Sequence, residues 1–179
     1  DIATWGMNKG LPNKVFSMGG RYTYEDQGET PNTQVATLKY PDGTMTVFEV
    51  RGRATNAEGD QKVGNLFYGS GGYAVGTRFY DTEGKEIPDE NAEQKPEWGT
   101  GNHFQNFVNA VLAHDANAVH GNATDAHTGC AHIHMANISY RLKTSLEFDP
   151  EAQQFIGNDD ANAMLTRDYR DGFQVPQPA

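Results

Sequence analysis

The chain has 179 residues, and 14 lysines and arginines against 24 aspartates and glutamates give it a formal net charge of −10. This charge, without any basic run, argues against nucleic acid as a partner, because phosphate binding needs clustered Lys and Arg. No apolar stretch reaches the roughly 18 residues of a membrane-spanning helix, and a single cysteine, Cys130, excludes an internal disulfide framework.

The apolar content is low for a folded chain of this length. Val, Leu, Ile and Phe total 31 residues, about 17%, a value that warns of disorder when the net charge is high. Eight Tyr, two Trp and several alternating segments offset that warning. We therefore expect one folded acidic domain over residues 1–179, with a lean core that a partner completes.

The chain opens with a segment that is typical of a helix interior, Asp1–Trp5, which indicates a fragment of a longer protein. A strand is expected over residues 15–24. Its Gly19-Gly20 pair marks either a bulge or a close approach of two backbones.

Two hairpins are expected next. Pro41-Asp42-Gly43 has turn chemistry between strands at 33–40 and 44–51. In this pair Ala36, Leu38 and Tyr40 share one face of the sheet, as Phe48 and Val50 do across the turn. Segments 64–68 and 73–80 form the second hairpin. Residues 88–101 are polar and acidic, and we expect them to be a long functional or disordered loop.

Beyond this loop the apolar pattern changes to a helical period. An amphipathic helix is expected over 102–114, with Phe104 and Phe107 as core residues, and a second helix over 124–142. A short strand at 146–148 and a helix that begins at an Asn158 cap and runs through Leu165 follow. Strands first and helices later indicate an α+β fold, with an open, mainly antiparallel sheet covered by helices on one face.

Histidine is the most informative residue type, since all six histidines lie between His103 and His134. His127, Cys130 and His134 fall on one helix face and could ligate zinc. The alternative is that the histidines face a cavity or form hydrogen bonds while Cys130 packs as a small hydrophobe. No CxxC or HExxH accompanies them, so no metal site is assigned. His132 is expected to be solvated.

Two other pairs could contact a polar ligand. His103 and Asn106, three residues apart, offer donors and acceptors, although helix capping and surface exposure explain them equally well. Arg21 and Tyr22 follow the glycine pair, where a bulge would redirect side chains toward a site, although an ordinary aromatic sheet face is the alternative. No GxSxG, P-loop or GxGxxG pattern is present, and Gly69-Ser70-Gly71-Gly72 is read as a turn.

Motifs spread over nearly the whole chain occur in the order found in one family. The segments are Asp1-Ile2-Ala3-Thr4-Trp5, Met18-Gly19-Gly20-Arg21-Tyr22, Gly28-Glu29-Thr30-Pro31-Asn32-Thr33-Gln34, Phe48-Glu49-Val50-Arg51-Gly52, His103-Phe104-Gln105-Asn106-Phe107, His127, His134-Met135-Ala136-Asn137-Ile138-Ser139-Tyr140-Arg141-Leu142, Leu146-Glu147-Phe148-Asp149-Pro150, Asp160-Ala161-Asn162 and Tyr169-Arg170. Together they resemble the C-terminal domain of the glucose–fructose oxidoreductase / inositol dehydrogenase / MocA (Gfo/Idh/MocA) family.

The resemblance implies a C-terminal domain like that of dihydrodipicolinate reductase or glyceraldehyde-3-phosphate dehydrogenase, without the N-terminal Rossmann domain that binds NAD or NADP. The catalytic lysine and the Asp…His pair of the family would lie upstream of Asp1. No catalytic, cofactor-binding or metal residue is therefore assigned, and this chain alone is expected to be inactive and to bind no cofactor. Whether such a protein works in the bacterial cytoplasm or periplasm is left open.

The residues carried over for contact with a sugar or polyol are His103, Asn106, His127, His134, Arg21 and Tyr22. Asn137 and Arg141 also match family positions, where they could instead anchor the helix. The resemblance further implies a homodimer or higher homo-oligomer formed through the sheet, with neither nucleic acid nor membrane as a partner.

Three functions stay open from the sequence. The first is the substrate and oligomerisation domain of an NAD(P)-dependent sugar or polyol oxidoreductase. The second is a stand-alone carbohydrate-binding or dimerisation module without catalysis. The third is a small metal-binding protein that uses His127, Cys130 and His134.

Overall fold

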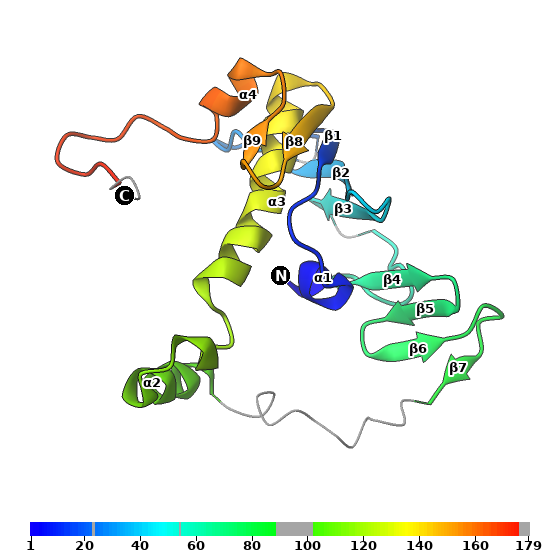
Figure 1. The fold of residues 1–179 in the computed structure, drawn as a ribbon. Coiled ribbons are helices and arrows are strands. Elements are labelled where there is room, and N and C mark those ends of the chain that lie inside the picture. Colours follow the sequence, from blue (N-terminus) through cyan, green and yellow to red (C-terminus); the bar gives the residue numbers. More distant parts are fainter. Residues whose placement is uncertain (23, 54, 89–101, 176–179) are drawn as a thin grey trace. The chain divides into compact units, whose positions relative to one another are not determined.

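The structure is a computed structural model that describes residues 1–22, 24–53, 55–88 and 102–175 (Figure 1). The chain divides into two compact units, each built from two stretches of sequence. The first unit comprises Asp1–Met7 and Arg53–Gly129, and the second comprises Asn8–Gly52 and Cys130–Ala179. Among the described residues, no helix is long and apolar enough to cross a membrane.

The second unit contains a five-stranded antiparallel sheet with strand order β3-β2-β1-β8-β9. Its strands are β1 (Lys14–Gly20), β2 (Thr33–Lys39), β3 (Met45–Arg51), β8 (Leu146–Asp149) and β9 (Gln154–Phe155). The predicted hairpin is confirmed, with Gly43 at φ +87° in the turn where glycine has no steric penalty. The sequence did not predict β9.

Helix α3 (Ala123–Leu142) covers one face of this sheet with its C-terminal half. The core between them consists of the buried residues Val15, Ala36, Leu38, Met135, Ala136, Ile138, Leu146, Phe148, Phe155 and Ala161. The last of these lies in α4 (Asp159–Ala163), a short helix capped by Asn158 as predicted. This arrangement confirms the α+β fold with an antiparallel sheet and a helix-covered face.

The opposite face of the five-stranded sheet is exposed although it is apolar. Strand alternation points five large side chains away from α3, with exposed fractions of 39–64%. They are Phe16, Met18, Val35, Met45 and Val47, and we call them the open sheet face. An apolar sheet face of this kind is normally covered by another element or another chain.

The strand expected over 15–24 is shorter than predicted. β1 ends at Gly20, and its pairing with β2 runs without a bulge to Gly20↔Thr33. The glycine pair marks a close backbone approach instead, since a Cβ on Gly19 would lie 2.3 Å from the Thr33 carbonyl oxygen. Only glycine can occupy that position without displacing the neighbouring strand.

The first unit contains a four-stranded antiparallel sheet with order β4-β5-β6-β7. Its strands are β4 (Leu66–Gly69), β5 (Gly72–Val75), β6 (Arg78–Tyr80) and β7 (Glu86–Ile87). The predicted strand over 73–80 is therefore wrong, because Gly76 at φ +59° turns the chain back between β5 and β6. The same unit holds α1 (Ile2–Met7), where a helical segment was expected.

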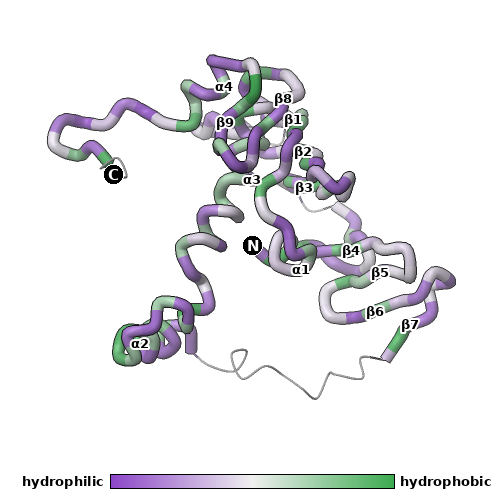
Figure 2. Tube along the Cα trace, in the orientation of Figure 1, coloured by the Kyte–Doolittle hydropathy of each residue, from purple (hydrophilic) through white to green (hydrophobic). Residues whose placement is uncertain are grey.

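Helix α2 (His103–Ala113) begins at the Asn102 cap and ends at His114, close to the predicted limits. A 3₁₀ turn, η2 (Ala116–Ala118), follows it. The prediction that Phe104 and Phe107 are core residues is wrong, because their side chains are 71% and 59% exposed. Helical periodicity identified the apolar side of α2 correctly, but in the described part of the chain only Ala110 of this helix is buried. Figure 2 shows the hydrophobic colouring of α2.

Candidate functional site

Arg21 and Tyr22 lie directly after β1, in the connection to β2. The Arg21 guanidinium donates to the Thr30 carbonyl oxygen at 2.7 Å and pairs with the Asp26 carboxylate. The backbone N–H of Tyr22 donates to Asn32 Oδ1 at 3.0 Å, and its hydroxyl donates to the Gly19 carbonyl oxygen at 3.3 Å, while the residue as a whole is 76% exposed. Arg21 therefore holds this connection in place, and the Tyr22 ring lies back over Gly20 with part of its surface exposed.

The same connection contains a polar group that sequence reasoning missed. Asn32 is buried, and its Nδ2 has no hydrogen-bond partner among the described residues. The Oδ1 atom of Asn137, on α3, is buried and unpartnered in the same way. Buried amide atoms usually find a partner, either protein or water. One donor and one acceptor are thus available to a water molecule or a ligand.

The Asn106 amide is used at both ends by the protein itself. Its Nδ2 donates to the Ala118 carbonyl oxygen at 2.8 Å, and its Oδ1 accepts from the backbone N–H of His120 at 3.0 Å. Asn106 therefore ties α2 to the segment after η2. His103, the first residue of α2, is exposed, and its ring lies edge-on to Phe104 at a centroid distance of 4.1 Å.

The histidines of α3 differ in their surroundings. His127 and His134 are exposed, so both can be reached from solvent. His132 is only 7% exposed, and its Nε2 lies 2.9 Å from the Tyr40 hydroxyl oxygen. The prediction that His132 is solvated is therefore wrong, because His132 faces the sheet and contacts Tyr40, the residue that follows β2.

Burial raises the pKa of Tyr40 above its usual value, although the hydrogen bond with Thr46 and the charge of Lys9 act in the opposite direction. The Tyr40 hydroxyl therefore stays protonated and available as a hydrogen-bond donor at neutral pH. Together, Tyr40 and His132 form a buried polar contact between the sheet and α3.

Within the described ranges, no three or more His, Cys, Asp or Glu side chains gather as a metal ion would require. Cys130 is a free, exposed thiol on α3. Among the described residues, the three possible zinc ligands named above, His127, Cys130 and His134, do not form one cluster.

The glycine-rich turn Gly69–Gly72 does not have the setting of a dinucleotide-binding turn. Among the described residues, the run Gly69–Gly72 connects the antiparallel strands β4 and β5. A dinucleotide site needs such a run between a strand and the N-terminus of a helix, where backbone N–H groups meet the pyrophosphate. We therefore assign no step of a reaction to a cofactor held by these residues.

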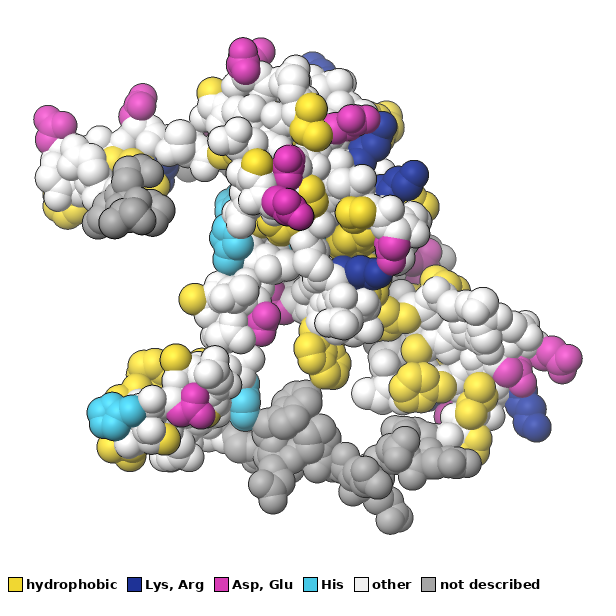
Figure 3. All heavy atoms as spheres, viewed as in Figure 1, with side chains coloured by type: hydrophobic (Ala, Val, Ile, Leu, Met, Phe, Trp, Pro, Cys, Tyr) yellow, Lys and Arg dark blue, Asp and Glu magenta, His cyan; other side chains and the backbone are white. Residues whose placement is uncertain are grey.

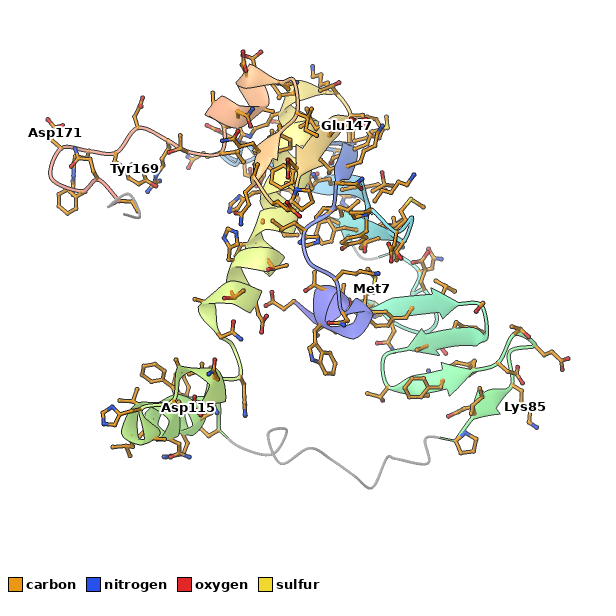
Figure 4. All side chains as sticks on the ribbon, in the orientation of Figure 1. Met7, Lys85, Asp115, Glu147, Tyr169 and Asp171 are labelled. Carbon is orange, nitrogen blue, oxygen red and sulfur yellow. The ribbon has the colours of Figure 1, made fainter. Side chains whose placement is uncertain are left out.

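The six residues proposed for sugar contact are divided between the two units. His103, Asn106 and His127 belong to the first unit, and Arg21, Tyr22 and His134 belong to the second. Each is described in its own unit, so their joint role in one site stays a prediction. Figure 4 shows the side chains on the ribbon and labels Asp115, at the end of α2, and Glu147, on β8.

The structure resembles two solved dehydrogenases. One is a probable dehydrogenase from Thermotoga maritima, at 16% identity and a TM-score of 0.52, with 82% of this chain and 46% of that chain covered. The other is the WlbA dehydrogenase from Bordetella pertussis in complex with NADH and UDP-GlcNAcA, at 17% identity and a TM-score of 0.51, with 83% and 43% covered. The chain thus spans less than half the length of either structure.

No curated protein matches the chain. A family model does: that of the C-terminal alpha/beta domain of the Gfo/Idh/MocA oxidoreductase family matches residues 25–175. This match covers most of the sequence and includes every strand and helix after β1. The chain therefore belongs to the Gfo/Idh/MocA oxidoreductase family, as its C-terminal alpha/beta domain.

Proposed function

We propose that this chain is the substrate-binding and assembly domain of an NAD(P)-dependent oxidoreductase that acts on a sugar or polyol. The observation that carries the proposal is the match of residues 25–175 to the C-terminal domain of an oxidoreductase family. The chain covers 46% and 43% of the two solved dehydrogenases, which leaves room in such proteins for a separate cofactor domain. The relative from Bordetella pertussis contains NADH and a nucleotide sugar.

The chemistry of the accessible side chains supports a hydroxyl-rich ligand. His103, His127 and His134 are exposed imidazoles, and Tyr22 is an exposed phenol ring. Imidazoles both donate and accept hydrogen bonds, as hydroxyl groups do, and an aromatic face suits the apolar side of a sugar ring. Within each unit, side chains of this kind can bind and orient a ligand, which is the contribution expected of a substrate domain.

A ligand screen tests this proposal. Ligand-observed NMR of the full chain with hexoses, uronic acids, polyols and nucleotide sugars should give saturation-transfer signals for at least one class. His127→Ala and His134→Ala should weaken the signal about tenfold or more, the loss expected from one or two hydrogen bonds. Asn109→Ala, an exposed change on α2, is the control. Signals from no class, or signals unaffected by either histidine variant, would contradict the proposed role.

We further propose that the open sheet face, Phe16, Met18, Val35, Met45 and Val47, is where copies of the chain assemble. Its apolar side chains lie opposite the α3-covered face, and covering them removes apolar surface from water. Val35→Glu should shift the assembly toward monomer in sedimentation velocity, whereas Ser145→Glu, in the turn before β8, should not. An unchanged mass for Val35→Glu would refute assembly through this face.

A further inference from the structure

His132 differs from the other five histidines because it is buried. All six lie in the described part of the chain, and the other five are exposed. In the space-filling view, histidine side chains are visible at the surface over α2 and α3 (Figure 3). His132 is the first buried side chain of α3, and its partner Tyr40 is only 2% exposed. Both residues belong to the second unit, as do the neighbouring Lys9, Asp42 and Thr46, so the contact lies inside one compact unit.

The hydroxyl hydrogen of Tyr40 has two possible acceptors. His132 Nε2 lies 2.9 Å from the hydroxyl oxygen, within the usual range of a hydrogen bond, whereas Thr46 Oγ1 lies 3.5 Å away, beyond that range. Burial raises the pKa of Tyr40, so the hydroxyl keeps its hydrogen at neutral pH. Because a buried hydroxyl hydrogen needs an acceptor, the shorter contact assigns His132 Nε2 that role. The imidazole is then neutral, with its single proton on Nδ1.

A second proton on His132 removes this acceptor. Both ring nitrogens of an imidazolium are donors. Among the described residues, the Tyr40 hydroxyl hydrogen then keeps only the longer contact with Thr46. The added charge also lies on a side chain that is 7% exposed, and burial disfavours the charged form of an imidazole. Protonation of His132 therefore costs both a hydrogen bond and the solvation of a charge.

The charged side chains beside Tyr40 do not reverse this preference. They are Lys9, in the segment before β1, whose charge acts on Tyr40, and Asp42, in the turn that follows Tyr40. Lys9 and Asp42 form an ion pair with one another, so together they attract a further positive charge only weakly. On α3 itself, the nearest titratable side chains in the sequence, Cys130 and His134, are exposed.

We propose that the contact between Tyr40 and His132 is an acid-sensitive latch, closed while His132 is neutral and released when His132 takes up a proton. The closed latch ties the first buried turn of α3 to the end of β2. Its release lets this turn move away from the sheet, while Met135, Ala136 and Ile138 remain in the core. The latch is independent of the proposed function, because it needs only contacts within the second unit.

The pH dependence of stability tests the latch. A free imidazole takes up its proton near about pH 6.5, so below that pH the unfolded chain binds one proton more than a fold whose His132 stays neutral. The stability that the neutral ring contributes is therefore fully present above this pH. As the pH falls further, it is lost by up to about tenfold in the folding equilibrium constant for each pH unit. Urea denaturation of the full chain over this pH range measures the loss.

His132→Gln separates the latch from other acid effects, because glutamine can accept the Tyr40 hydrogen bond but does not titrate. Between about pH 6 and pH 5, the folding equilibrium constant of the parent chain should fall up to about tenfold more than that of His132→Gln. His134→Gln, which replaces an exposed ring on the same helix, is the matched control and should follow the parent chain. Parallel curves for the parent chain and His132→Gln would overturn the proposal.

Nitrogen-15 NMR of the imidazole rings tests the latch in the parent chain and needs no variant. At neutral pH we expect His132 to carry its proton on Nδ1, with Nε2 bare, and nuclear Overhauser effects to connect its ring with that of Tyr40. These effects should disappear at the pH where the His132 ring becomes charged. A proton on Nε2 at neutral pH, or a charged His132 ring that keeps its contact with Tyr40, would contradict the latch.

Discussion

Ser139 connects α3 to the sheet through one buried hydroxyl. Its side chain is fully buried, and its Oγ accepts from the Ser17 backbone N–H at 3.0 Å while it donates to the Thr144 carbonyl oxygen at 2.7 Å. The pairing of β1 with β8 covers Lys14 and Val15 and does not extend to Ser17. The Ser139 hydroxyl therefore accepts the hydrogen bond of the Ser17 N–H at a position where β8 no longer pairs with β1.

Ser139→Ala removes this partner and leaves the Ser17 N–H buried without a hydrogen bond. An unsatisfied buried donor costs about 1–3 kcal/mol, so we expect the free energy of unfolding to fall by about 2 kcal/mol, a large share of the roughly 5–15 kcal/mol of a typical domain. Urea denaturation followed by far-UV circular dichroism measures it. Trp5 belongs to the first unit, so circular dichroism is the more direct probe of the sheet and helix of the second unit.

Thr124→Ala, an exposed change at the start of the same helix, is the control and should alter stability by less than about 0.5 kcal/mol. Amide hydrogen exchange at Ser17 adds a local readout, because its protection should fall in Ser139→Ala alone. A loss of stability below about 0.5 kcal/mol, with exchange unchanged, would refute the assignment of Ser139 as the partner of Ser17.

Three further changes test other parts of the fold. Gly19→Ala should lower the melting temperature, because its Cβ would lie 2.3 Å from the Thr33 carbonyl oxygen. Gly10→Ala, whose Cβ would have no atom within 4 Å, should not. Equal melting temperatures for the two variants would contradict the close approach of the strands at Gly19. Tyr40→Phe should flatten the loss of stability above pH 10. The pKa of Tyr40 is raised in the fold, so the stability that its hydroxyl contributes is fully present below the pKa of the unfolded state. That stability is lost as the pH rises through the pKa of the folded state. The hydrogen bond from Lys9, together with that from the Thr44 N–H, lowers the pKa of Asp42 from 3.8 to about 2. Asp42→Asn should therefore remove a contribution to stability that the parent chain keeps above pH 4 and loses as the pH falls toward 2. Identical acid titrations of stability for the variant and the parent chain would argue against the Lys9 contact.

The sequence was informative wherever local chemistry decides the structure. The hairpin of β2 and β3 follows from side-chain alternation around Pro41-Asp42-Gly43, and the limits of α2 and α3 follow from helical periodicity and caps. The break between β5 and β6 was missed because it rests on one glycine conformation, that of Gly76.

The site was harder to predict because its contacts are distant in sequence. The burial of His132 depends on Tyr40, 92 residues away, and no local pattern around either residue signals the pair. Periodicity marked Phe104 and Phe107 as apolar, but it contains no information on what covers them. Of the six predicted contact residues, Asn106 turned out to have both amide ends bonded to backbone.

We propose that this chain is the substrate domain of an oxidoreductase and that the cofactor is bound elsewhere. Titration of the purified chain with NADH, followed by energy transfer from tryptophan to the nicotinamide, tests it most directly. We expect no saturable signal at NADH concentrations that span the range in which the sugar or polyol identified by NMR binds. Saturable, stoichiometric NADH binding by this chain alone would contradict it.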